Sequence, residues 1–124
     1  MTTVVADASV VAAIVFREKG ADKLLERLDG EALHAPELLK YELANIALSK
    51  ARAEPDRTPQ ILSRLAEFFE TREIRWHHVD PVDVVLVARA TGLTAYDASY
   101  LWLAGWLEAD LVTLDKRLSA ALEA

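Results

Sequence analysis

Residues 3–16, TVVADASVVAAIVF, decide the fold of this chain. The stretch begins with the β-branched pair Val4 and Val5, reaches a single acid at Asp7, and continues into an apolar run with room for about two helical turns. The resulting order of strand, acid and helix puts Asp7 at the carboxyl end of a strand, where ligands bind in open α/β sheets. Asp7 also suits a helix N-cap, and this stretch alone favours that structural role.

Outward from this stretch, strand and helix patterns alternate along the chain. Such alternation is typical of an α/β fold with a mostly parallel sheet. Further strands are expected at residues 32–35, 74–79 and 110–114, and helices at residues 21–29, 36–53, 58–72, 80–91, 94–107 and around 118–122. The two long helices at 36–53 and 58–72 are expected to form an antiparallel arm.

Composition narrows the class of protein. The chain has 124 residues, which predicts a single domain over residues 1–124. It has no cysteine, which excludes disulfides and thiolate metal sites. The net charge of −6 argues against nucleic-acid binding by bulk charge, but it allows a nuclease whose acids gather at a metal. No signal peptide or membrane-spanning run is evident, so we expect a soluble, cytoplasmic protein without a membrane partner.

Two further acids occupy places comparable to that of Asp7. Asp115 follows the last predicted strand, and Asp97 lies at the start of the helix before that strand, within the capping-box-like sequence Thr94-Ala95-Tyr96-Asp97. Taken singly, each acid has the alternative role of a favourable charge near a helix N-terminus.

Glu42 is harder to explain as a structural residue. It shares a helical face with Leu38, Leu39 and Ile46, so that face is predicted to be buried. An unpaired buried carboxylate costs roughly several kcal/mol, so it needs a cation, a set of hydrogen bonds or a raised pKa. A buried Arg or Lys partner is one solution. A bound metal is another, and it accounts for all four acids together.

A divalent cation would relieve the repulsion among carboxylates that are brought close together. Hard oxygen ligands suit Mg²⁺ or Mn²⁺, which are therefore the expected cofactors. Because Mg²⁺ usually takes only one or two carboxylates directly, the other acids would hold metal-bound waters or position the nucleophile.

Four motifs in this order resemble the PIN-domain family, and within it the VapC toxins of toxin–antitoxin pairs. They are VVADASVV around Asp7, ELLKYELANIAL around Glu42, LTAYDASYLWLA around Asp97 and LVTLDKRL around Asp115. The resemblance implies a three-layer α/β/α fold with a central parallel sheet. Related chains usually continue into a fifth strand, whereas this sequence stops at Ala124, so four strands are expected here and five in a longer chain.

The resemblance also implies an activity, a site and partners. The activity is that of an Mg²⁺- or Mn²⁺-dependent endoribonuclease, with Asp7, Glu42, Asp97 and Asp115 as its catalytic and metal-binding acids. Ser9 and Asn45 match polar positions near such a site. The implied partners are an RNA substrate, a VapB-like antitoxin whose tail blocks the site, and a second copy of the chain in a homodimer.

The remaining polar and aromatic residues are less informative. Arg17, Lys116 and Arg117 are candidate RNA contacts, because basic residues position a phosphate backbone without reading its sequence. His77 and His78 are neighbours in a predicted strand and point to opposite faces, so a structural or surface role is favoured over shared metal binding. Trp102 and Trp106 lie one turn apart, which favours core packing or a dimer interface over base stacking.

Two alternative functions stay open at this level. A phospho-receiver domain has a similar size and alternation, but it needs a pair of acids after the first strand, an Asp after a middle strand and a Lys after the last. This chain has Asp7 alone after the first strand, histidines at the middle-strand end and Asp115 after the last. The other alternative is a PIN scaffold that has lost catalysis and serves as an interaction module.

Overall fold

Four parallel strands form the centre of the molecule. The structure is a computed structural model that describes residues 2–123. The strands are β1 (Thr3–Ala6), β2 (Ala32–Pro36), β3 (Arg75–His77) and β4 (Asp110–Val112), in the order β3-β2-β1-β4. Val4 of β1 lies opposite Leu33 of β2, and Val5 lies opposite Leu111 of β4. Because every pairing is parallel, the carboxyl ends of all four strands lie at one edge of the sheet.

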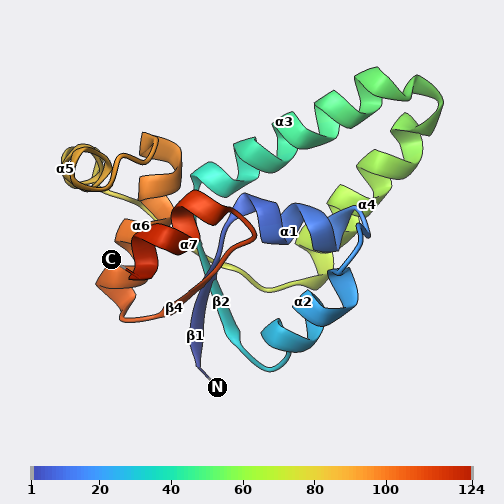
Figure 1. Cartoon of the computed structure of the whole chain (residues 1–124). Helices are drawn as coiled ribbons and strands as arrows, with labels where there is room; N and C mark the ends of the chain where they lie inside the picture. The colour runs from blue at the N-terminus through green and yellow to red at the C-terminus, as the bar shows by residue number, and fades with distance from the viewer. Residues whose placement is uncertain (1, 124) are drawn as a thin grey trace.

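The chain reverses its direction across the sheet at β1. It moves outward from β1 to β2 and β3, and then returns to β4 on the other side of β1. Crossovers between parallel strands are almost always right-handed, so this reversal sends the helices to opposite faces. Figure 1 shows α1 (Ala8–Val15), α2 (Ala21–Leu28), α3 (Leu38–Ala53) and α4 (Thr58–Thr71) on one side, and α5 (Pro81–Thr91), α6 (Ala95–Leu107) and α7 (Lys116–Glu123) on the other.

The sheet and its two helical layers confirm the predicted three-layer α/β/α fold. The strand order also creates a topological switch point between β1 and β4. In open α/β sheets, ligands bind in the crevice outside the carboxyl ends of the strands at such a point. This part of the fold therefore positions the site.

The core explains why the opening stretch is so apolar. Val4 and Val5 point to opposite faces of the sheet, and both are fully buried. Strands covered on both faces have hydrophobic residues at successive positions instead of alternating ones. On one face α1 contributes Val10 and Val11 to the core, and on the other α6 contributes Leu103.

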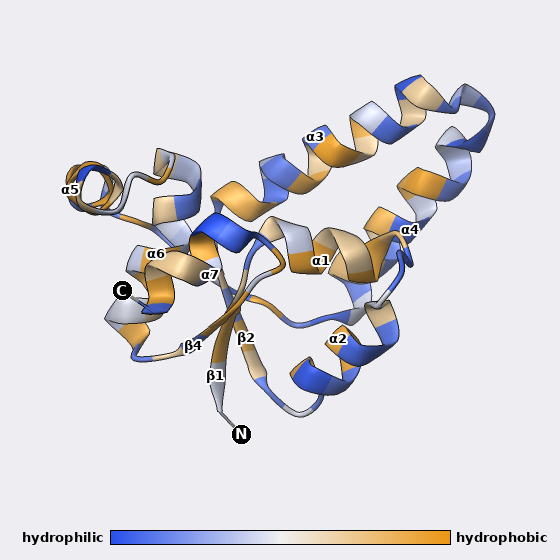
Figure 2. Cartoon of the chain, viewed as in Figure 1, coloured by the Kyte–Doolittle hydropathy of each residue, from blue (hydrophilic) through white to orange (hydrophobic). Residues whose placement is uncertain are grey.

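Helices α3 and α4 form the predicted antiparallel arm, which extends away from the sheet (Figure 1). A short 3-10 turn, Pro55–Arg57, joins them. Figure 2 shows mixed polar and apolar colouring along the arm, and its tip carries an exposed ion pair between Arg57 and Glu54 at 3.0 Å. Within residues 2–123, no helix combines the length and the apolar character needed to cross a membrane.

Two strands end earlier than the sequence predicts. Strand β3 ends at His77 because Asp80 and Pro81 already begin α5, with Asp80 Oδ1 accepting a hydrogen bond from Val82 N. Strand β4 ends at Val112 because the next two residues make contacts with the β1 end instead of the ladder. The described residues contain four strands, and the chain end at Ala124 lies outside them.

Candidate active site at the carboxyl edge of the sheet

Asp7 is the most firmly held of the four predicted acids. It lies between β1 and α1, is only 4% exposed, and caps α1 by accepting a hydrogen bond from Val10 N at 3.2 Å. Ser9 Oγ donates to Asp7 Oδ1 at 2.6 Å, and Thr113 Oγ1 donates to Asp7 Oδ2 at 2.6 Å. The capping role is therefore confirmed, and the carboxylate is at the same time fixed at the carboxyl end of β1, beside the switch point.

The segment after β4 is tied to the same carboxylate. Thr113 Oγ1 also accepts from Asp115 N at 2.9 Å, and Leu114 N donates to Ser9 Oγ at 3.0 Å. These bonds join the carboxyl ends of β1 and β4 and hold the hydroxyl of Ser9 beside Asp7. Thr113 was not predicted, although a hydroxyl directly after the strand Asp110–Val112 could have signalled it.

Asp115 has a local role as well. Its Oδ1 accepts from Arg117 N at 2.8 Å and from Leu118 N at 3.1 Å, which is a helix cap at the start of α7. This cap fixes the orientation of the Asp115 carboxylate after β4, and the backbone N–H of Asp115 is held by Thr113 Oγ1.

Glu42 reaches the site from the arm. Its pKa is raised chiefly by burial and also by the charges of Asp97 and Asp7, while a hydrogen bond from Tyr100 acts in the opposite direction. The Tyr100 hydroxyl donates to Glu42 Oε1 at 2.6 Å. A buried carboxylate was expected to need a partner, and the partner of Glu42 is the hydroxyl of Tyr100.

The burial predicted for the face of α3 needs a correction. The fully buried residues are Leu39, Leu43 and Ala47, which leaves Glu42 partly buried at the edge of that stripe. The buried stripe is thus shifted by one position from the predicted one, and α3 extends away from the sheet along the arm (Figure 1). An edge position lets Glu42 face the other acids while it remains shielded from most solvent.

Asp97 links the other acids electrostatically. It lies in the first turn of α6, where its backbone N–H donates to the capping Thr94 Oγ1 at 3.1 Å, as the capping-box pattern predicted. Burial raises the pKa of the Asp97 carboxyl, the nearby charges of Asp115 and Asp7 raise it further, and the charge of Arg117 partly offsets this. The pKa of Asp97 is therefore affected by acids that follow both strands of the switch point, Asp7 after β1 and Asp115 after β4. The pKa of Glu42 is affected by Asp97 and Asp7.

The donor set fits a hydrated divalent cation. It consists of carboxylate and hydroxyl oxygens, which Mg²⁺ and Mn²⁺ prefer, and the acids repel one another without a cation. Among the described residues, no three His, Asp or Glu side chains are close enough to enclose a metal by themselves. Mg²⁺ usually binds through one or two carboxylates and retains waters, so these residues suit an ion held partly through water.

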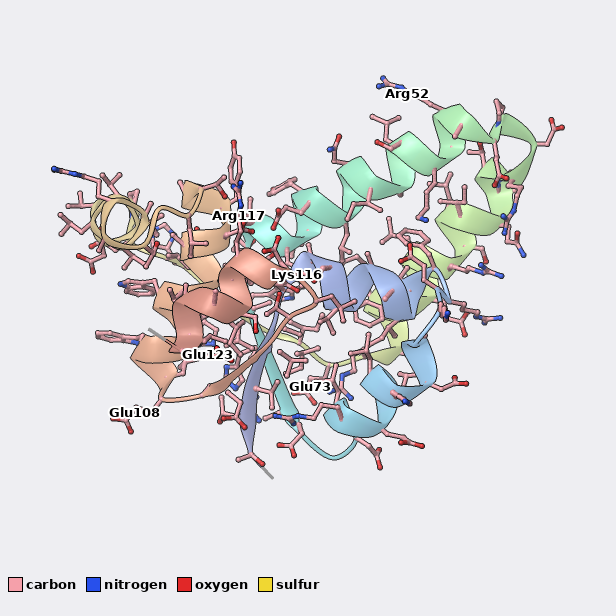
Figure 3. All side chains as sticks on the ribbon, in the orientation of Figure 1. Arg52, Glu73, Glu108, Lys116, Arg117 and Glu123 are labelled. Carbon is pink, nitrogen blue, oxygen red and sulfur yellow. The ribbon has the colours of Figure 1, made fainter. Side chains whose placement is uncertain are left out.

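The remaining predicted residues are not all beside the acids. Figure 3 shows Lys116 and Arg117 at the start of α7, and Arg117 is near enough to affect Asp97. Asn45 is exposed about one turn beyond Glu42 on α3. Arg17 follows the far end of α1, so it is separated from Asp7 by roughly 12 Å of helix.

The histidines are structural or exposed, as predicted. His34 Nδ1 and His77 Nε2 lie 2.6 Å apart, and the two rings stack with their centroids 4.9 Å apart. His78 is exposed. The pair bridges β2 and β3.

Of the two environments expected for the tryptophans, core packing or a dimer interface, Trp102 packs against the core and Trp106 does not. Trp102 and Trp106 stack with their centroids 5.6 Å apart, and Trp106 is 72% exposed. Trp102 Nε1 donates to Asp83 Oδ2 at 3.2 Å, which links α6 to α5.

The fold and the site together define an α/β domain with a carboxylate cluster at the switch point of a parallel sheet. The chain belongs to the PIN-domain family, which matches residues 4–122. It is 33% identical over 120 residues to Ribonuclease VapC3 from Pyrobaculum aerophilum, an alignment that covers 93% of this chain and 91% of that protein.

A solved structure supports the same relationship. The crystal structure of PAE2754 from Pyrobaculum aerophilum superposes with a TM-score of 0.76 at 28% sequence identity, and the match covers 97% of this chain and 86% of that one. The predicted membership of the PIN-domain family is thus confirmed. Family membership also decides against the phospho-receiver alternative.

Proposed function

We propose that this protein is an Mg²⁺- or Mn²⁺-dependent endoribonuclease and the toxin of a VapBC-type toxin–antitoxin pair. The observation that carries the proposal is the convergence of Asp7, Glu42, Asp97 and Asp115 from four separate segments. Besides burial, the charges of Asp97 and Asp7 raise the pKa of Glu42, and the charges of Asp115 and Asp7 raise the pKa of Asp97. The similarity to Ribonuclease VapC3 supports RNA as the substrate.

The residues have distinct proposed tasks. Asp7 and Asp97 would hold the metal ion, and Glu42 and Asp115 would orient waters around it. A divalent ion at this site would polarise a phosphate oxygen and lower the pKa of a bound water. Ser9 and Thr113 keep Asp7 in one orientation, because they donate to its two different carboxylate oxygens. Asn45, on the exposed side of α3, is proposed as an auxiliary polar contact.

Basic residues beside the acids are proposed to position the RNA backbone. Lys116 and Arg117 are exposed at the start of α7, at the edge of the site. Arg17 would contact a more distant phosphate, because it follows the opposite end of α1. The protein as a whole repels RNA because its net charge is −6. Binding of RNA would therefore depend on basic side chains placed beside the site.

A homodimer and a VapB-like antitoxin are the proposed protein partners. The exposed apolar side chains Val82, Val85 and Leu86 on α5, together with Tyr96 on α6, are each more than half exposed. Val82, Val85 and Leu86 share one face of α5 by their spacing of three and four residues. Val85 also lines one groove with Tyr96, and an exposed apolar patch marks an interaction surface when it is large. We assign this patch to the homodimer. Sedimentation of wild type and Leu86→Glu tests the assignment, and an unchanged mass would reject it.

Cleavage of a labelled RNA pool tests the enzymatic proposal. Wild type should cut RNA with Mg²⁺ or Mn²⁺ and should stop when EDTA is added. Asp7→Asn should lose cleavage while its circular dichroism stays unchanged. The matched control is Asp22→Asn, because Asp22 also lies near the N-terminus of a helix but is exposed, in the first turn of α2. It should cut like wild type.

Two outcomes would reject the proposal. If the Asp7→Asn variant cuts RNA as fast as wild type, the four acids are not the catalytic site. A wild-type protein without metal-dependent cleavage under any condition would favour an interaction module. Metal binding has an independent readout, since a cation at 100 times its Kd should raise the free energy of unfolding by about 2.7 kcal/mol.

A further inference from the structure

We propose that Tyr100 is a positioning residue whose hydroxyl fixes the Glu42 carboxylate in the orientation that the metal site uses. This inference rests on the proposed function, since it concerns the same carboxylate cluster. Tyr100 comes from α6 and Glu42 from α3, and the two residues are 58 positions apart in the sequence.

The contact between the two side chains is short and shielded. The Tyr100 hydroxyl lies 2.6 Å from Glu42 Oε1, and the tyrosine is only 1% exposed. Hydrogen bonds from a hydroxyl to a carboxylate in this range of length are about twice as strong as neutral ones. Within residues 2–123, no other side chain donates a hydrogen bond to Glu42. The orientation of this carboxylate therefore depends on a single donor.

Tyr100 connects the arm to α6, the helix that carries Asp97. Tyr100 lies three residues after Asp97, so the two side chains project from the same face of α6. Glu42 belongs to α3, which leads into the projecting arm (Figure 1). The hydrogen bond thus fixes the position of the Glu42 carboxylate, which belongs to the arm, relative to the helix that carries Asp97.

A neutral donor suits this task better than a cation. A Lys or Arg partner would neutralise Glu42 and compete with a metal for it, whereas a hydroxyl leaves the full negative charge in place. The contact uses Oε1 and leaves Oε2 available for a metal-bound water. Asp7 also has neutral side-chain donors, the hydroxyls of Ser9 and Thr113.

The test is Tyr100→Phe in the full chain, which keeps the ring and removes only the hydroxyl. Loss of an outer-shell partner typically weakens metal affinity by about 10- to 100-fold, so we expect such a loss in Mn²⁺ affinity measured by electron paramagnetic resonance. At saturating Mn²⁺, kcat for RNA should fall while KM stays close to wild type. Tyr41→Phe is the matched control, because Tyr41 is adjacent to Glu42 in sequence but 70% exposed.

The outcomes separate this inference from the proposed function. A wild type that neither binds Mn²⁺ nor cuts RNA rejects the proposed function. A wild type that does both, with Tyr100→Phe within twofold of it in Mn²⁺ affinity and kcat, overturns the role of Tyr100. A merely structural role would lower the unfolding temperature in EDTA without changing Mn²⁺ affinity.

A second measurement covers a variant that fails to fold. Of the three tyrosines in the chain, Tyr41 and Tyr96 are exposed, so a slowly exchanging tyrosine hydroxyl proton in the wild-type NMR spectrum is expected from Tyr100. Adding Mg²⁺ should shift this resonance, and Glu42→Gln should abolish the response. A resonance that Mg²⁺ leaves unmoved, in protein shown to bind Mg²⁺, would overturn the proposal.

Discussion

Replacing Thr113, the partly buried residue directly after β4, with valine removes one hydroxyl and leaves the shape of the side chain nearly unchanged. That hydroxyl donates to Asp7 Oδ2 at 2.6 Å and accepts from Asp115 N at 2.9 Å. Because Asp7 is only 4% exposed, water cannot readily replace the lost donor. The substitution therefore tests whether the site depends on this hydroxyl.

The magnitude follows from the two hydrogen bonds. A hydrogen bond to a charged group contributes about 1.5–3 kcal/mol and a neutral one about 1 kcal/mol. Thr113→Val should therefore lower the free energy of unfolding by about 2.5–4 kcal/mol. For a chain of this size, roughly 4 °C of unfolding temperature corresponds to each kcal/mol, so the midpoint should fall by about 10–16 °C.

Urea unfolding followed by tryptophan fluorescence measures the change, with EDTA present so that metal binding does not contribute. Thr71→Val is the matched control, because Thr71 Oγ1 makes a bond of similar length, 2.7 Å, to the neutral carbonyl oxygen of Glu67 on the exposed face of α4. Its effect should stay within about 0.5 kcal/mol. If Thr113→Val also stayed within 0.5 kcal/mol of wild type, the hydroxyl would not be holding the buried Asp7 carboxylate.

Three further predictions concern charge. Burial and the charges of Asp97 and Asp7 raise the pKa of Glu42, so its favourable contribution to stability is full below about pH 4.5 and is lost as the pH rises. Glu42→Gln should accordingly stabilise the metal-free protein at pH 7.5 and lose that advantage near pH 4, and equal unfolding midpoints at pH 7.5 would contradict this. Burial, with the charges of His77 and Arg75, lowers the pKa of His34, so stability should fall as the pH drops below about 6.5. His34→Gln should flatten this slope in urea unfolding between pH 7.5 and 5.5, and an unchanged slope would exclude His34 as its source. Asp110→Asn, which breaks an exposed 3.1 Å ion pair with Arg27, should change stability by less than about 1 kcal/mol, and a larger loss would show that this pair is shielded from solvent.

Much of the fold was predictable because its signals are local. The strand–acid–helix order of residues 3–16 follows from side-chain preferences over a few neighbouring positions, and the structure places β1, Asp7 and α1 in that order. The same holds for the capping residues, since a cap involves a side chain and a backbone N–H two or three positions away. The burial of α3 was less predictable, because it depends on the angle at which that helix packs.

The sequence alone determined the order of the elements and the acids Asp7, Glu42, Asp97 and Asp115, because periodicity, capping and an acid on an apolar helix face can be read from adjacent residues. Only the tertiary structure decided which groups hold these acids. Thr113 meets Asp7 across 106 positions, and Tyr100 meets Glu42 across 58. These partners are set by the parallel strand order and by the packing of α6 against the sheet, and neither leaves a periodic signal in the chain.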